Sequence, residues 1–438
     1  MKKLTTFKIV LFAFFIVGAL AGLVAFSLYQ GGSSGAKGVG TVVIWGTLPQ
    51  ASMDATLQAA KQSDQSLKGV SYVEKNPATL AADLATAIAT DNAPGLVLAS
   101  QQELYSIHRF LASIPLSSLP VSTFENTFIS EGNLFRVPNN GGYYGMPFLV
   151  DPLVLFSNNA ILASDNIALP PSTWDALTGL VPNVAVYSST RQVTRGLIAL
   201  GSYDNVQNAQ AIISAILLQE GVSVTAYGGA GNVVANLNES QGASGQLPGE
   251  AAVRFYTQFA DPSKVSYTWN QSMPNSQQAF SSGDLALYLG FASEASYFTS
   301  ANPNLAFTVS PLPQLAGAAT KTTYGKLYAF MVPRASPNIA GAYAAASALI
   351  GISDEKAAAV ATGLAPAVRQ VLASASAQDP VAAVAYASAL YAAGWLSPAP
   401  ADTDRVFSAM ITSVLNGSAT FATAVSTAQS SLNALLQS

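Results

Sequence analysis

Short apolar runs and amphipathic stretches alternate along the chain after residue 40. The β-branched run at 41–46 ends in glycine, which is typical of a buried strand, and similar runs predict strands at 69–73 and 96–98. A helix is predicted at 51–61, and apolar residues at every fourth position from 80 to 88 predict another. Strands that alternate with helices in this way predict an α/β domain with a parallel sheet.

The rest of the chain begins with a long apolar run and ends in helices. The run at 148–156 predicts a further strand, and the capping-box spacing of 172–175 predicts the start of a helix. Beyond Pro337 the sequence predicts an almost wholly helical region, with candidate helices at 339–350, 354–362, 369–374, 380–393, 403–415 and 419–437.

An uncharged apolar segment lies near the N-terminus. Residues 9–29 carry no charge, and a helix of that length spans about 31 Å, enough to cross the core of a bilayer. Lys2, Lys3 and Lys8 precede it, and the positive-inside rule places such residues in the cytoplasm. The segment therefore predicts a single-pass membrane anchor with the rest of the chain on the extracytoplasmic side.

This anchor divides the N-terminal part into a cytoplasmic stub at 1–8, a transmembrane segment at 9–29 and a flexible linker at 30–40. A cleaved signal peptide is the alternative, because residues 19–21 resemble a small-residue cleavage site. The apolar run is longer than a signal peptide requires, which favours the uncleaved anchor. Export is expected in both cases.

Composition and charge exclude several classes of function. Hydrophobic residues make up 50% of the 438 and charged residues only 10%. Four of the 19 basic residues precede residue 41, so 15 basic and 23 acidic residues follow it, a net charge of −8. Such a surface lacks the basic surplus that a nucleic-acid-binding protein needs. Nucleic acid is therefore not an expected partner.

Cysteine is absent and His108 is the single histidine. Disulfides, thiolate catalysis, cysteine-ligated zinc and a histidine metal cluster are therefore excluded. No nucleophile elbow, P-loop, dinucleotide-binding or zinc-protease motif occurs either. We expect no enzyme activity, no catalytic residue, no cofactor and no metal.

Aromatic residues in polar surroundings are candidates for carbohydrate contacts. A sugar presents ring faces that aromatic side chains can cover, and hydroxyls that need polar partners. Trp45 follows the first predicted strand, Tyr144 precedes the apolar run, and Trp269 and Trp395 lie in polar loops. Core packing is the alternative for each of these side chains.

Asp151 is the single charge between positions 141 and 157, and a proline follows it. A buried strand does not carry an unpaired carboxylate without a cost in free energy. Asp151 therefore either reaches a polar partner or faces a binding site, and the sequence leaves both open. Arg191 and Arg195 are expected to be solvated or ion-paired.

Several segments, taken in chain order, resemble a known family. Residues 144–158 (YGMPFLVDPLVLFSN) look like the "YG-x-P-x-x-x-D-x-L-x-L-x-x-N" segment of extracellular solute-binding proteins of family 1, which are maltose-binding-protein-like. Residues 170–177 resemble the family's "PP-x-TW-D/E-x-L", and 279–287 resemble its "AF-x-x-G-x-x-AM". Pro311-Leu312-Pro313 and the helical tail from 411 are similar to later family segments. One departure stands out, since residues 290–293 (GFAS) replace an aromatic-rich "GPW" segment.

The resemblance implies an α/β, two-lobed, periplasmic-binding-protein-like (type II) fold, with the N-terminal transmembrane helix in front and a helical C-terminal region. One lobe is expected from 41–150 plus 312–337, and the other from 151–311 plus 338–438. In this family the ligand lies in a cleft between the lobes, which close on it by hinge motion.

By the same resemblance, the chain is expected to be the substrate-binding component of an ABC importer. It would bind a mono- or oligosaccharide and deliver it to permease subunits. Carried over by motif position, Asp151 is a ligand contact and Phe291 takes the stacking role of the family's tryptophan. Trp45, Trp269, Trp395 and Tyr144 are added from the placement of aromatic residues.

Two alternatives stay open. A surface hydrolase of glycans could use Asp151 with a second carboxylate, since spatial pairing is invisible in sequence. An adhesive or structural surface protein could keep the same fold without transport. The departure at 290–293 leaves the identity of the ligand open.

Overall fold

The computed structural model describes residues 38–229, 231–238, 247–374 and 379–437. The predicted stub at 1–8, the anchor at 9–29 and most of the linker at 30–40 lie outside these described residues. Among the residues that are described, no helix is both long enough and apolar enough to cross a bilayer.

The chain folds into two compact units, which we call unit 1 and unit 2. Of the described residues, unit 1 contains 38–150 and 327–374, and unit 2 contains 151–326 and 379–437. Strands β4 (Gly145–Asn158) and β11 (Thr323–Met331) each contribute residues to both units.

The sheet of unit 1 contains the strands predicted first along the sequence. They are β1 (Val42–Gly46), β2 (Val70–Glu74) and β3 (Leu96–Ser100). β1 pairs in parallel with β2 and β3, which confirms the predicted parallel arrangement. The strand order continues through β11, antiparallel to β3, to β4. The short strand β12 (Ala365–Pro366) pairs with β4.

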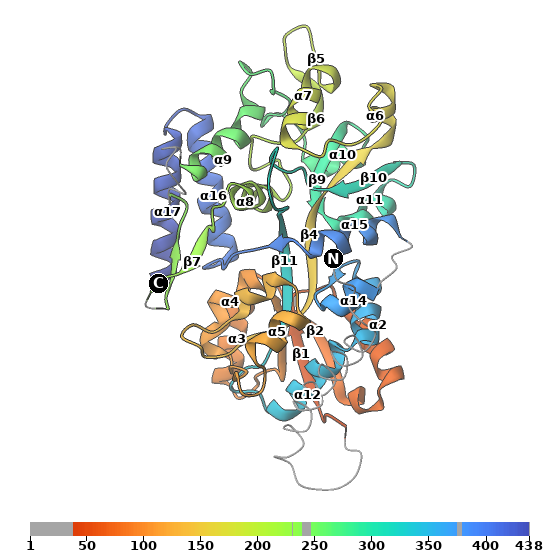
Figure 1. Cartoon of the computed structure of the whole chain (residues 1–438), viewed down its shortest axis with the longest axis vertical. Coiled ribbons are helices and arrows are strands. Elements are labelled where there is room, and N and C mark those ends of the chain that lie inside the picture. Colours follow the sequence, from red (N-terminus) through yellow and green to blue (C-terminus); the bar gives the residue numbers. More distant parts are fainter. Residues whose placement is uncertain (1–37, 230, 239–246, 375–378, 438) are drawn as a thin grey trace. The chain divides into compact units, whose positions relative to one another are not determined.

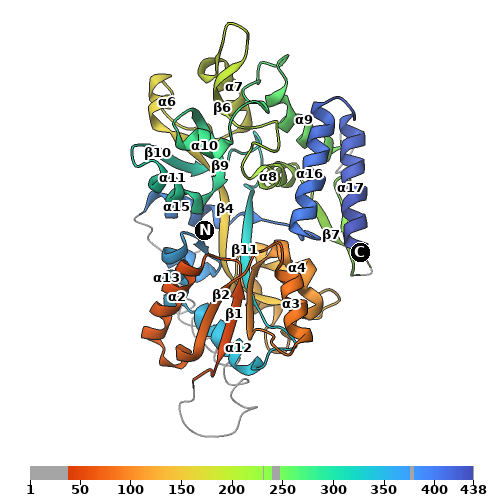
Figure 2. The same cartoon turned by 180° about the vertical axis from the view of Figure 1, so that it is seen from behind.

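Helices flank this sheet, with α2 and α13 together on one side of unit 1 and α3 and α4 on the other (Figure 1; α13 is labelled in Figure 2). The helices of unit 1 are α2 (Gln50–Ser63), α3 (Leu80–Ala89), α4 (Gln101–Ile107), α5 (Val121–Thr127), α12 (Ile339–Leu349), α13 (Ile352–Thr362) and α14 (Arg369–Ser374), with 3-10 turns η1 (Gln65–Gly69), η2 (His108–Phe110) and η3 (Ser130–Phe135).

Unit 2 has a mixed sheet and a separate hairpin. In the sheet, β4 pairs with β9 (Leu285–Phe291), β9 with β6 (Val193–Ile198), and β6 with β5 (Val186–Tyr187). The remaining strands are β10 (Phe307–Pro311) against β4, β13 (Ala392–Ala393) against β11, and the hairpin of β7 (Thr225–Tyr227) and β8 (Val233–Ala235).

The C-terminal helices α16 and α17 run side by side in unit 2, next to α9 (Figure 2). The helices of unit 2 are α6 (Asn159–Ser164), α7 (Trp174–Val184), α8 (Ala209–Gln219), α9 (Pro248–Thr257), α10 (Ser276–Ser281), α11 (Ala295–Ala301), α15 (Pro380–Ala389), α16 (Pro400–Leu415) and α17 (Phe421–Gln437), with 3-10 turns η4 (Gln258–Ala260) and η5 (Ala292–Glu294).

The units divide the chain differently from the expected lobes at two places. Helices α12 to α14 belong to unit 1, although 338–438 was expected in the second lobe. The reason is packing: α12 contacts β1, α13 contacts α2, and the Asn338 amide donates to the Val39 carbonyl. Residues 312–326 belong to unit 2, where the Gln219 amide donates to the carbonyls of Pro313 and Thr322.

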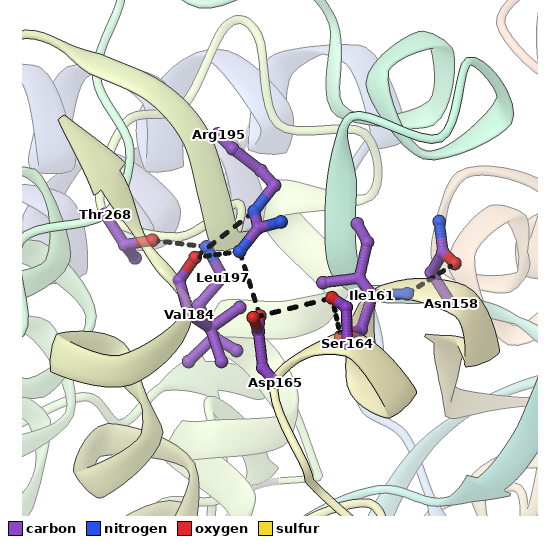
Figure 3. Close-up of polar contacts among 8 residues, drawn as sticks. All are labelled: Asn158, Ile161, Ser164, Asp165, Val184, Arg195, Leu197 and Thr268. Atoms are coloured by element: carbon purple, nitrogen blue, oxygen red, sulfur yellow. Dashed lines mark hydrogen bonds and ion pairs between the residues drawn. The ribbon is translucent and has the colours of Figure 1, made fainter. Parts of the chain in front are cut away.

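Arg195 links three elements of unit 2 through hydrogen bonds and an ion pair (Figure 3). From β6, its guanidinium donates to the Val184 carbonyl at the end of α7 and to the Asp165 carboxylate, 2.9 Å away, beyond α6. Asn158 caps α6 by accepting from the Ile161 N–H, and Thr268 Oγ1 accepts from the backbone of β6. The ion-paired alternative for Arg195 is therefore the observed one.

Candidate functional site

Asp151 opens the part of β4 that belongs to unit 2, and it is 6% exposed. Its Oδ2 accepts a hydrogen bond from the Ser293 hydroxyl at 2.6 Å, and its Oδ1 accepts one from the Ser293 N–H at 3.2 Å. The carboxyl that sequence reasoning singled out thus has a polar partner. A carboxylate has about four lone-pair positions, so these two bonds leave acceptor capacity free.

Burial raises the pKa of Asp151 to about 6. The two hydrogen bonds from Ser293 and the positive charge of Lys326 oppose this rise because they stabilise the ionised form, while the charge of Glu294 adds to it. Asp151 is therefore ionised at neutral pH but at a cost in free energy, which is the condition expected of a group kept for binding.

Phe291 lies at the end of β9, opposite Leu153 of β4, and is 5% exposed. The Lys326 ammonium sits 4.3 Å from the centre of its ring, and the Tyr324 ring lies 6.4 Å away. We call Asp151, Phe291, Ser293 and Lys326 the Asp151 cluster. It combines an anionic acceptor, a hydroxyl, a cationic donor and an aromatic ring within unit 2.

Two predicted contact residues lie in unit 1. Trp45 is half-buried near the carboxyl end of β1, and the Lys75 ammonium lies 3.8 Å from the centre of its ring. Carboxyl ends of strands are where open α/β sheets bind ligands. Tyr144 is half-buried just before β4, with the His108 ring 5.9 Å away in an edge contact.

Trp269 and Trp395, by contrast, are core residues of unit 2. They are 0% and 1% exposed, so neither offers a ring face to a ligand. Trp395 stacks on Phe407 and donates from Nε1 to the Ser214 hydroxyl at 3.0 Å. Burial of apolar area stabilises both side chains. For these two residues, core packing replaces the predicted ligand contact.

Sequence reasoning missed Ser293 and Lys326 as members of the cluster. Ser293 lies 142 positions from Asp151 along the chain, so no local pattern joins them. Lys326 did carry a signal, since it is the single charge within β11. Among the described residues, no group of three or more histidine, cysteine or acidic side chains could hold a metal ion.

The chain belongs to the bacterial extracellular solute-binding proteins, because the model of that family matches residues 57–385. The family resemblance inferred from the motifs is therefore confirmed. No curated protein matches the sequence.

Solved structures of the same fold include sugar-binding receptors. The GacH receptor of Streptomyces glaucescens, solved unliganded and with acarbose, is 18% identical, with a TM-score of 0.67 over 91% of this chain and 98% of that one. The cyclic α-maltosyl-1,6-maltose binding protein of Arthrobacter globiformis is 16% identical, with a TM-score of 0.71 over 91% and 99%. The maltotriose-bound MalE domain of Bdellovibrio bacteriovorus is 14% identical, with a TM-score of 0.65 over 91% and 100%. At these identities, the likeness shows a shared two-lobed α/β fold.

Proposed function

We propose that this protein is the substrate-binding component of an ABC importer and that its ligand is a mono- or oligosaccharide. The observation that carries the proposal is the Asp151 cluster within a chain of this family. The structural neighbours named above bind acarbose, a cyclic maltosaccharide and maltotriose, which supports the carbohydrate class.

The cluster has the chemistry that a sugar needs. The free lone pairs of Asp151 accept from ligand hydroxyls, and the Lys326 ammonium donates to ligand oxygens. Phe291 supplies an apolar ring beside these charges. By the family resemblance both lobes contribute, so Trp45 and Tyr144 are the proposed contacts from the other lobe.

Binding involves no bond cleavage in this proposal. The free energy of ligand binding favours a closed form of the two lobes, which the permease subunits recognise. Residues 9–29 act as an uncleaved anchor that keeps the protein at the membrane, with its soluble part on the extracytoplasmic side.

The hydrolase alternative requires a second free carboxyl next to Asp151. The acidic side chain whose charge acts on Asp151 is Glu294, and both of its oxygens accept hydrogen bonds from the protein itself. Glu294 is therefore poorly suited to act as a general acid, which favours binding over hydrolysis.

A thermal-shift screen tests the proposal. The full chain, in detergent, is heated with mono-, di- and oligosaccharides, and with amino acids and oligopeptides as controls. A ligand at about 100 times its Kd adds roughly 2.7 kcal/mol, which raises Tm by a few degrees. We expect a saccharide shift that is lost in Asp151→Ala and kept in Asp284→Asn, a change at an exposed carboxylate of the same unit.

A shift with a peptide or amino acid alone would keep the family and overturn the carbohydrate class. If no compound of the panel raises Tm, the adhesive or structural alternative is favoured. Small-angle X-ray scattering with and without the ligand tests the proposed closure, since a closed form has a smaller radius of gyration.

A further inference from the structure

The Glu294 carboxylate accepts four hydrogen bonds, from three segments of unit 2. Its Oε1 accepts from the Phe291 N–H at 2.9 Å and from the Asn208 amide at 2.6 Å. Its Oε2 accepts from the Gln277 amide at 2.8 Å and from the Tyr288 hydroxyl. These donors come from the starts of α8 and α10 and from β9, so the carboxylate joins three elements to the turn η5 that contains it.

Three residues next to Glu294 have properties that fit these four hydrogen bonds. Burial raises the pKa of Tyr288 well above its usual value, so its hydroxyl keeps the proton that it donates. Asn208 holds a left-handed backbone with φ of 62°, which carries a conformational cost for a residue other than glycine. A Cβ at Gly290 would lie 2.3 Å from the Tyr288 ring and 3.0 Å from Glu294 Oε1, so only glycine fits there.

The turn that Glu294 holds carries two members of the Asp151 cluster. The Phe291 N–H donates directly to the Glu294 carboxylate, and the Phe291 ring lies under the Lys326 ammonium. Ser293, the residue before Glu294, gives both of its donors to Asp151. A small rotation of this turn would separate Ser293 from Asp151, because hydrogen bonds weaken steeply with distance and angle.

We propose that Glu294 is a positioning residue for ligand binding: its carboxylate fixes the 290–294 turn so that Ser293 bonds Asp151 and Phe291 faces Lys326. The expected effect on saccharide binding rests on the proposed function. The positioning itself is a property of the ligand-free protein and can be measured without any ligand.

The first arm of the test titrates Asp151 in the ligand-free full chain. Aspartate is labelled with ¹³C at the carboxyl, and the Asp151 signal is assigned by its loss in Asp151→Asn. In Glu294→Gln, one oxygen becomes an amide that cannot accept, so two of the four bonds are lost. The Ser293 bonds lower the pKa of Asp151 more than the Glu294 charge raises it. We therefore expect the midpoint of Asp151 to move to higher pH, as it should in Ser293→Ala.

The sign of this shift separates positioning from other roles. If Glu294 acted on Asp151 through its charge alone, Glu294→Gln would move the midpoint to lower pH, and an unchanged midpoint would show no coupling. Either result overturns the proposal. Combining Glu294→Gln with Ser293→Ala should shift the midpoint by less than the sum of the two single shifts, because the hydroxyl bond that Glu294 positions is already absent in Ser293→Ala. Fully additive shifts would also overturn the proposal. Tyr288→Phe removes a single donor and should give a smaller upward shift with less risk to folding.

The second arm measures maltotriose binding by calorimetry. Glu294→Gln should weaken binding about tenfold, the loss expected for one charge-assisted hydrogen bond to the ligand site. The matched control Asp284→Asn changes an exposed carboxylate at the other end of β9 and should bind as the unmodified chain does. Unchanged binding in Glu294→Gln contradicts the proposal. A failure of all saccharides to bind contradicts the proposed function instead, and the titration then decides the positioning role alone.

Discussion

Replacing Asp151 by asparagine should stabilise the protein at neutral pH while weakening ligand binding. The side chain is 6% exposed, and burial raises its pKa from 3.8 to about 6. Each pKa unit is worth about 1.36 kcal/mol, so this difference corresponds to about 3 kcal/mol. The free energy is the cost of keeping a buried carboxylate ionised, and a neutral amide of similar size avoids it.

The dependence of this cost on pH follows from the direction of the pKa change. Above about pH 6, Asp151 is ionised in both the native and the unfolded chain, so the native state bears the full cost. As the pH falls from 6 towards 3.8, the native state takes up a proton while the unfolded chain remains ionised, and stability increases. Near pH 4 the native carboxyl is neutral, and the advantage of asparagine disappears.

Urea unfolding of the full chain at pH 7.5 and at pH 4.5 measures this difference directly. Other titrating groups are common to both proteins and cancel when Asp151→Asn is compared with the unmodified chain at each pH. We expect Asp151→Asn to be more stable by up to about 3 kcal/mol at pH 7.5 and by much less at pH 4.5. A destabilised variant at pH 7.5, or a difference that does not change with pH, would refute the reasoning.

Three further predictions concern residues that each stabilise the interior of one unit. Trp395→Ala should lower the free energy of unfolding by about 3–5 kcal/mol in urea titration, because it empties a core site and orphans the Ser214 hydroxyl, whereas Trp395→Phe should lose less. Glu355 is fully buried and accepts hydrogen bonds from the backbone N–H groups of Ala367 and Val368, just before α14. Glu355→Ala should lower the free energy of unfolding by about 2–5 kcal/mol and Glu355→Gln by clearly less, and equal losses would contradict this role. Gly142→Ala should lower Tm by several degrees, because φ is 95° and the new Cβ would lie 1.9 Å from the Ile114 carbonyl oxygen; an unchanged Tm would show that this loop has another conformation.

The sequence identified Asp151 but not its surroundings. A single charge in a long apolar run is a local signal, and it pointed to a residue with a perturbed pKa. Its partners Ser293 and Lys326 lie far along the chain, and only folding brings them to β4. The parallel strands of unit 1, unlike these partners, could be predicted, since each strand is encoded by a short local pattern.

The aromatic residues show where local patterns fail. Trp269 and Trp395 stand in stretches of polar and small residues, which suggested exposure, yet both are buried. Trp395 packs on Phe407 of α16 and bonds Ser214 of α8, and Trp269 lies against Gly196 of β6. Most of these contacts join residues far apart in the sequence, and no local pattern records them. The helices at 339–374 were correctly expected as helices, but a helical pattern tells which face is apolar and not which sheet that face covers.

The sharing of β4 and β11 between the units has a consequence for the order in which the chain can fold. The sheet of unit 1 begins with strands near residue 42 but needs β11, whose pairing joins Ser100 with Tyr328. Most of unit 2 is synthesised between those two residues, and unit 2 itself waits for α16 and α17 at the C-terminus. Contacts this distant slow folding. The core of unit 1 therefore remains incomplete until α14 has been synthesised, and that of unit 2 until α16 and α17 have been. No single cut in the chain can release either unit whole.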